Sequence, residues 1–139
     1  MHRQITLQTE PIDEKALIDS RQIPGSMGAV ATFSGVVRGT EGALSLAGIE
    51  YEAFPEMVHH QFGLLLNAIE QRWAIESIRL VHRIGFVPTN QPSLWVEVVA
   101  AHRAEAFQAI QYLIDEMKRV VPIWKKPVAL PHGTAGPVS

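Results

Sequence analysis

Residues 100–126, AAHRAEAFQAIQYLIDEMKRVVPIWKK, contain the clearest periodic pattern of the chain. Over residues 103–121, apolar side chains recur at spacings of three and four, which is typical of an amphipathic helix. Pro122 cannot continue a helix. The pattern therefore predicts a long helix that follows a strand and ends at a sharp break. Its apolar stripe consists of Phe107, Ile110, Ile114, Met117 and Val121.

The residues before this helix alternate between predicted strands and two further helices. A second amphipathic pattern covers residues 55–73, and Asp13 is a suitable cap for a short helix that ends at residue 19. Short strand pairs interleaved with two long helices favour an α+β fold over an all-parallel sheet. We therefore expect an α+β fold with antiparallel strands, two long helices and one short helix. The predicted strands cover residues 5–9, 29–38, 46–53, 78–87 and 94–101.

Length and composition indicate one globular unit. The chain has 139 residues, of which 47% are hydrophobic and 19% are charged. We expect a single domain over residues 1–139, with a short irregular tail from about residue 127. The net charge of −2 provides no basic field for nucleic acid. No apolar run has the length of a signal-peptide core or a membrane span, so we expect no membrane partner and a cytoplasmic location.

The chain contains no cysteine. Disulfides, thiol catalysis and Cys-ligated zinc or iron–sulfur clusters are therefore excluded, and any sulfur chemistry must use sulfur from another molecule. The neighbouring His59 and His60 cannot share one helix face, and no H-x-x-x-H or H-E-x-x-H motif occurs. We expect neither a metal nor a cofactor.

Lysine is rare and clustered. Three of the four lysines, Lys118, Lys125 and Lys126, lie within ten residues. The cluster has two interpretations. It complements the negative end of the helix dipole, or it forms a cationic pocket in which crowding favours a neutral, nucleophilic amine. In the second case, the break at Pro122 lets the chain fold back and bring Lys118 and Lys125 to one site.

Histidine and arginine side chains provide further candidates. His102 and Arg103 lie where a strand gives way to the long helix, a position that suits anion binding, although His102 alternatively only caps the helix. Arg38, beside a glycine-flanked loop, either stays solvated or clamps a phosphate or carboxylate. His82 is in phase with the apolar residues of its strand, so we interpret it as a core histidine.

Four segments, taken in order, resemble the large, catalytic subunits of molybdopterin synthase. They are GAVATFSGVVRG (28–39), IEYEAFPEM (49–57), HRIGFV (82–87) and the stretch 100–126. The resemblance implies an α+β fold of the α/β hammerhead type. It also implies a sulfurtransferase that installs the two dithiolene sulfurs of molybdopterin on cyclic pyranopterin monophosphate, in molybdenum cofactor biosynthesis.

The same resemblance implies an assembly and a set of residue roles. The assembly is a homodimer that binds a small ubiquitin-like subunit at each end, giving a heterotetramer. Sulfur arrives as a thiocarboxylate on the C-terminal glycine of that small subunit, so the large subunit needs no cysteine. Lys118 and Lys125 would be catalytic. The substrate phosphate and pterin would be held, within one protomer or across the dimer, by Arg38, His102, Arg103 and Lys126.

Two other functions remain open from the sequence. The first is a non-catalytic α+β binding or scaffold module, a paralogue that has lost turnover. Such a module would be expected to lose its basic cluster, whereas both catalytic lysines and Arg38 are present, which favours the enzyme. The second is an RNA-binding domain that stacks bases on Trp124, but it would need a wider basic surface.

Overall fold

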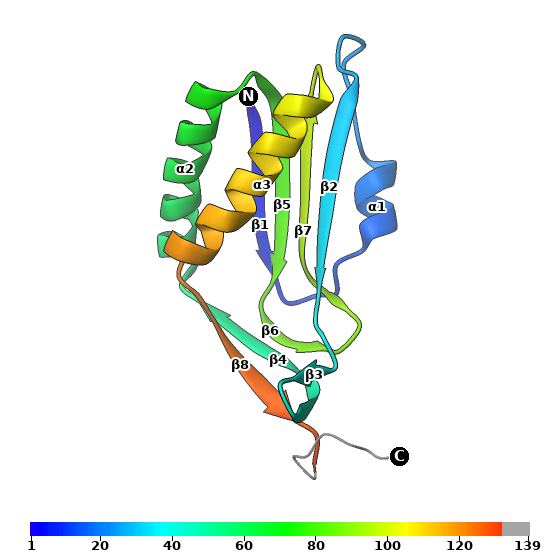
Figure 1. The fold of residues 1–139 in the computed structure, drawn as a ribbon, viewed down its shortest axis with the longest axis vertical. Coiled ribbons are helices and arrows are strands. Elements are labelled where there is room, and N and C mark those ends of the chain that lie inside the picture. The colour runs from blue at the N-terminus through cyan, green and yellow to red at the C-terminus, as the bar shows by residue number, and fades with distance from the viewer. Residues whose placement is uncertain (132–139) are drawn as a thin grey trace.

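A four-stranded sheet forms the larger layer of the molecule (Figure 1). The structure is a computed structural model, and it describes residues 1–131. The strand order is β1-β5-β7-β2, with β5 and β7 in the centre. The bounds are β1 His2–Gln8, β2 Ala29–Val36, β5 Ile75–Arg83 and β7 Pro92–Ala100.

The two long helices cover one face of this sheet. Helix α2 spans Pro55–Arg72 and α3 spans Arg103–Val120, so both predicted helices are confirmed to within a residue or two. Their apolar faces meet alternate residues of the central strands and form the main core. The predicted stripe of α3 is wrong at Phe107, which is 62% exposed, whereas Ala106, Ala109 and Leu113 are buried. Phe62, Leu80 and Leu113 in this core are fully buried. The α+β class, with two long helices and one short helix, is therefore confirmed.

The short helix α1, Glu14–Asp19, is capped by the Asp13 side chain as expected. Leu17 of α1 packs on a small apolar cluster that contains Val81 and Trp95. These two residues alternate with the residues that face α2 and α3, so α1 covers the opposite face of the sheet.

A buried carboxylate holds the segment after α1 to the sheet. Glu97 on β7 is only 2% exposed and accepts hydrogen bonds from Arg21 Nε at 2.6 Å and Arg79 Nε at 2.8 Å. Arg79 also donates to the Leu17 carbonyl at 2.7 Å. Burial alone would raise the pKa of Glu97, but the hydrogen bonds and charges of Arg79 and Arg21 outweigh it, so the pKa is lowered below 4.5.

A second, smaller sheet is built around strand β4 (Figure 1). Strand β4, Leu44–Ala53, pairs with β6, Gly85–Pro88, and with β8, Ile123–Ala129. The short strand β3, Thr40–Glu41, forms a hairpin with the start of β4. A Cβ atom on Gly48 would lie 2.3 Å from the Val87 carbonyl oxygen, so glycine permits the close β4–β6 approach.

One predicted strand, residues 78–87, is wrong as a single element. The chain forms β5 up to Arg83 and β6 from Gly85, and the two strands belong to different sheets. Gly85 has φ +86°, a conformation that side chains with a Cβ rarely adopt. The turn at Gly85 therefore redirects the chain from the larger sheet into the smaller one.

Two further expectations need correction. The strands are not all antiparallel, because β1 pairs with β5 in parallel. The tail does not become irregular at residue 127, because Pro127 and Val128 are still paired with β4 as part of β8. The rest of the expected tail, residues 132–139, lies outside the described residues.

Candidate active site

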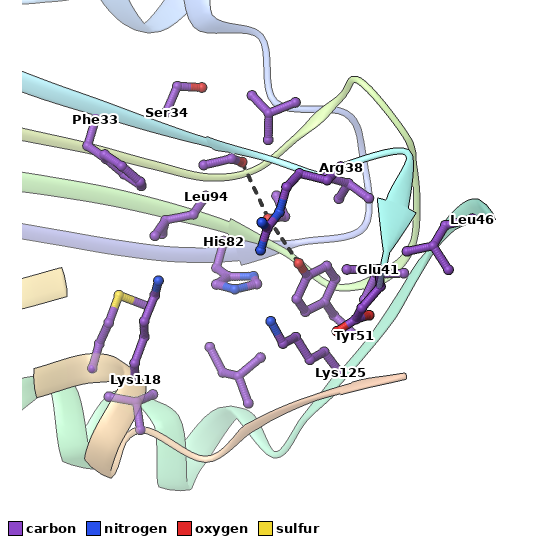
Figure 2. A pocket seen from close by; sticks show the side chains of 18 of the residues that line it. Phe33, Ser34, Arg38, Glu41, Leu46, Tyr51, His82, Leu94, Lys118 and Lys125 are labelled. Atoms are coloured by element: carbon purple, nitrogen blue, oxygen red, sulfur yellow. Dashed lines mark hydrogen bonds between the residues drawn. The ribbon is translucent and has the colours of Figure 1, made fainter. Parts of the chain in front are cut away.

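A cavity of about 770 Å³ lies where the two sheets and the C-terminal end of α3 meet (Figure 2). Its lining comes from the end of β2, the β3–β4 hairpin, the middle of β4, the end of β5, the start of β7 and the segment from α3 into β8. Segments that are far apart in the sequence thus line one cavity. The volume suits a small molecule.

Three cationic side chains from three parts of the chain line this cavity. They are Arg38, after β2, Lys118 in the last turn of α3, and Lys125 on β8. Figure 2 shows the two lysine side chains extending into the same space below Arg38. None of the three forms an ion pair with another residue of the 1–131 range. Glu41 is the single acidic residue of the described lining, so the cavity carries positive charge and suits an anion.

The β8 strand explains how Lys118 and Lys125 reach one site. Helix α3 ends at Val120, and Pro122 lies between the helix and β8. The chain then runs antiparallel to β4, which places Lys125 opposite Tyr51. Lys126, the next residue, lies opposite Glu50 and does not line the cavity. Consecutive side chains of a strand point to opposite faces, so Lys126 projects away from the other two lysines.

The structure does not bring His102 and Arg103 to this cavity within one protomer. They lie at the N-terminal end of α3, and fifteen residues of helix place Arg103 roughly 22 Å from Lys118 along the axis. Both side chains are exposed. His102 is the N-cap residue of α3, and its carbonyl accepts from the Ala106 amide, but its side chain makes no capping hydrogen bond.

Three polar cavity residues were missed by the sequence interpretation. His82 is 5% exposed and, as predicted, continues the apolar face of β5, but it lies where that face meets the cavity. The Tyr51 hydroxyl donates to Ser93 Oγ at 3.1 Å, and the Tyr51 ring packs edge-on against His82, with centroids 5.0 Å apart. The alternation pattern predicts the orientation of His82 but not what covers it, because the cavity is formed by β4 and β8, which are distant in sequence.

The described residues show two further features relevant to function. No helix within residues 1–131 is long and apolar enough to cross a membrane. In the same range, no group of three or more His, Asp or Glu side chains is arranged to hold a metal ion.

The fold and the cavity define an α+β protein with a cationic site between two sheets. The sequence model of the MoaE protein family matches residues 7–120, and the chain belongs to this family. The molybdopterin synthase catalytic subunit of Caulobacter vibrioides is 34% identical over 137 residues, which cover 96% of this chain and 85% of the relative. The rat subunit of the same name is 38% identical over 101 residues. The chain spans only 50% of the length of that rat relative.

Solved structures agree with this assignment. Molybdopterin synthase from Staphylococcus aureus superposes with a TM-score of 0.80 at 30% identity, covering 94% of this chain and 93% of that one. A Helicobacter pylori complex of subunits 1 and 2 of molybdopterin-converting factor contains the same fold, with a TM-score of 0.69 at 17% identity and coverage of 96% and 92%.

Proposed function

We propose that this protein transfers sulfur from a thiocarboxylated carrier protein to cyclic pyranopterin monophosphate, as a molybdopterin synthase. The observation that carries the proposal is the convergence of Arg38, Lys118 and Lys125 on one cavity. Both reactants are anions, since the substrate has a phosphate group and the carrier ends in a thiocarboxylate. Three cations in a partly enclosed site bind such groups and stabilise the charge that moves during transfer.

Each cation has a proposed role. Lys118 engages the thiocarboxylate and the carbon that receives the sulfur, because its side chain enters the cavity from the last turn of α3. Lys125 enters from β8 and acts as the acid–base or electrostatic partner. Arg38 has the planar, bidentate geometry that suits a phosphate. Lys126 projects to the other face of β8, so we no longer assign it to the substrate.

The remaining anion-binding residues come from a second protomer in this proposal. His102 and Arg103 are exposed at the far end of α3, too distant to serve the cavity of their own chain. A two-fold homodimer places the same surface of each protomer against the other and so can bring this end of one protomer to the cavity of its partner. The relatives named catalytic subunit and the two-subunit Helicobacter pylori complex support a small carrier subunit as the other partner.

Reconstitution tests this function. The protein is mixed with a thiocarboxylated ubiquitin-like carrier and the pyranopterin substrate, and the dithiolene product is measured by mass spectrometry. We expect product from the wild type and almost none from Lys118→Ala. The matched control is Lys126→Ala, which removes a lysine of the same cluster that does not line the cavity. If a folded wild-type protein binds carrier and substrate but makes no product, it is instead the non-catalytic binding module.

A further inference from the structure

His82 has one ring nitrogen fixed by the backbone and the other one free. Its Nδ1 lies 2.8 Å from the carbonyl oxygen of Arg83. A carbonyl oxygen only accepts hydrogen bonds, so Nδ1 carries the proton and donates it. In the neutral ring, Nε2 then has a lone pair and is a hydrogen-bond acceptor. The strand backbone therefore selects the tautomer.

The free nitrogen is open to the cavity. Nε2 makes no hydrogen bond with any residue of the described chain. Within the same residues, every side-chain nitrogen or oxygen that is fully buried does have a hydrogen-bond partner. Nε2 is therefore not sealed from solvent, although the residue is only 5% exposed. Figure 2 shows the His82 ring facing the space that Lys118 and Lys125 enter. The Tyr51 ring, at an interplanar angle of 72°, limits its rotation.

The surroundings keep this imidazole neutral. Burial lowers the pKa of His82 below its ordinary value of 6.5, and the hydrogen bond to the Arg83 carbonyl opposes this shift without cancelling it. The titratable and charged side chains that line the cavity with His82 are Arg38, Glu41, Tyr51, Lys118 and Lys125.

A sulfur transfer from a thiocarboxylate creates a need for such a base. When the thiocarboxylate sulfur replaces an oxygen substituent on a substrate carbon, that oxygen leaves with its electron pair while the sulfur stays attached to its acyl carbon. The product is a thioester between carrier and substrate. Water must cleave that thioester to free the sulfur. Water is a weak nucleophile and needs a proton acceptor, and an ammonium or guanidinium group has no lone pair to accept a proton.

We propose that Nε2 of His82 is the general base that activates water for hydrolysis of the carrier–substrate thioester. The proposal rests on the proposed function. The water oxygen bonds to the acyl carbon while one of its protons passes to Nε2. The bond between the acyl carbon and sulfur then breaks with its electron pair on sulfur, giving a substrate thiolate stabilised by Lys118 or Lys125. The carrier leaves as a carboxylic acid, whose single acidic proton is the second proton of the water and passes to solvent, and His82 then gives the proton on Nε2 to solvent.

The test is a single-turnover reaction with His82→Asn. An asparagine amide placed at the Nδ1 position still donates to the Arg83 carbonyl, but it has no group at the position of Nε2. We expect product formation to slow by about 10²- to 10⁴-fold, the usual loss for one acid–base group. The carrier–substrate adduct should accumulate and be visible by intact-protein mass spectrometry. Free imidazole should restore part of the rate, an effect that a purely structural role would not produce.

Two variants and one direct measurement complete the design. His60→Asn makes the same substitution on the exposed surface of α2 and should react like the wild type. His82→Gln keeps a polar group in the cavity but also lacks the imidazole base. If His82→Asn does not fold, the same rate and adduct measurements are made on His82→Gln. Nitrogen NMR of the wild type should show a neutral ring protonated on Nδ1 at pH 7. An imidazolium at that pH, or a proton on Nε2, would overturn the proposal.

The outcomes separate this proposal from the broader one. If the wild type makes no product, the proposed function fails before His82 is tested. If the wild type makes product, and folded His82→Asn makes it at the same rate without accumulating the adduct, His82 only lines the cavity and is not the general base. If the adduct accumulates in His82→Asn but free imidazole does not restore the rate, His82 is not the general base. The substitution has then moved the thioester out of its reactive position in the cavity.

Discussion

Lys125 on β8 lies directly opposite Tyr51 on β4, and both side chains line the same cavity. Paired residues of neighbouring strands project from the same face of a sheet. Lys126 is paired with Glu50 and so belongs to the other face. The register of the β4–β8 ladder therefore determines which of two consecutive lysines enters the site.

This register predicts different outcomes for the two lysines. Lys125→Ala should lower product formation by about 10²- to 10⁴-fold, because it removes a charged group from the proposed reaction site. Lys126→Ala should stay close to the wild type in rate. Both residues are exposed, so each substitution should change the free energy of unfolding by less than about 0.5 kcal/mol. Single-turnover rates and thermal unfolding measure both effects. Full activity of Lys125→Ala with an inactive Lys126→Ala would show that the register is wrong.

A site shared between protomers predicts complementation. Lys118→Ala and Arg103→Ala should each be nearly inactive alone. In mixed dimers, one cavity carries both substitutions and the other carries none, so refolding an equal mixture should restore about a quarter of the wild-type activity. Product assays before and after mixing measure this recovery, and a mixture of Lys118→Ala with Lys125→Ala is the control that should not recover. No recovery in the first mixture would place Arg103 outside the partner's site.

Glu97 predicts an acid-sensitive contribution to stability. Glu97→Gln should lower the free energy of unfolding at pH 7 by about 3 kcal/mol, because Arg21 and Arg79 lose a buried anionic partner. The folded-state pKa is below 4.5, so the ionised carboxylate stabilises the fold above pH 4.5, and this stabilisation is lost as the pH falls through the folded-state value. Urea unfolding from pH 7 to 3 should show wild type and variant converging in acid. A constant difference across this range would contradict the assignment.

Gly48 predicts a steric effect on the smaller sheet. In Gly48→Ala, the new methyl group meets the Val87 carbonyl at 2.3 Å and the Phe86 ring at 2.6 Å, so β6 must shift. We expect a loss of about 1–3 kcal/mol in the free energy of unfolding, together with reduced activity, since β4 also positions Tyr51. Gly63→Ala in α2 is the control, because its Cβ enters open space and a helical alanine is stabilising by about 0.5–1 kcal/mol. Thermal unfolding of the two variants should move in opposite directions.

The sequence predicts the helices well because their patterns are local. The apolar spacing from Phe107 to Met117 predicts the extent of α3, although Phe107 itself is exposed. The break at Pro122 predicts that Lys118 and Lys125 approach each other, and both line the cavity. The division of residues 78–87 between two sheets is not visible in the pattern, because its apolar alternation continues up to the φ +86° turn at Gly85. Strand β8 is also missed, since its polar residues are stabilised by pairing with distant β4.

For the cavity residues too, a local sequence pattern does not show contacts between distant parts of the chain. Arg38 could be singled out from its glycine-flanked loop, whereas Tyr51 and Ser93 are linked across 42 positions of sequence. His82 has the alternation of a core residue, and only the placement of the second sheet shows that it faces a cavity. His102 and Arg103 are exposed in the single chain, so the role proposed for them requires a second protomer.

Three passages lead the chain from the larger sheet and its helices into the smaller sheet, and each carries a cavity residue. Arg38 lies between β2 and β3, His82 lies just before the turn into β6, and Lys118 and Lys125 flank the passage from α3 into β8. A bound anion that contacts these side chains thus links the larger sheet and its helices to the smaller sheet. Its binding energy opposes their separation, so amide hydrogen exchange in β4, β6 and β8 becomes slower when the site is filled.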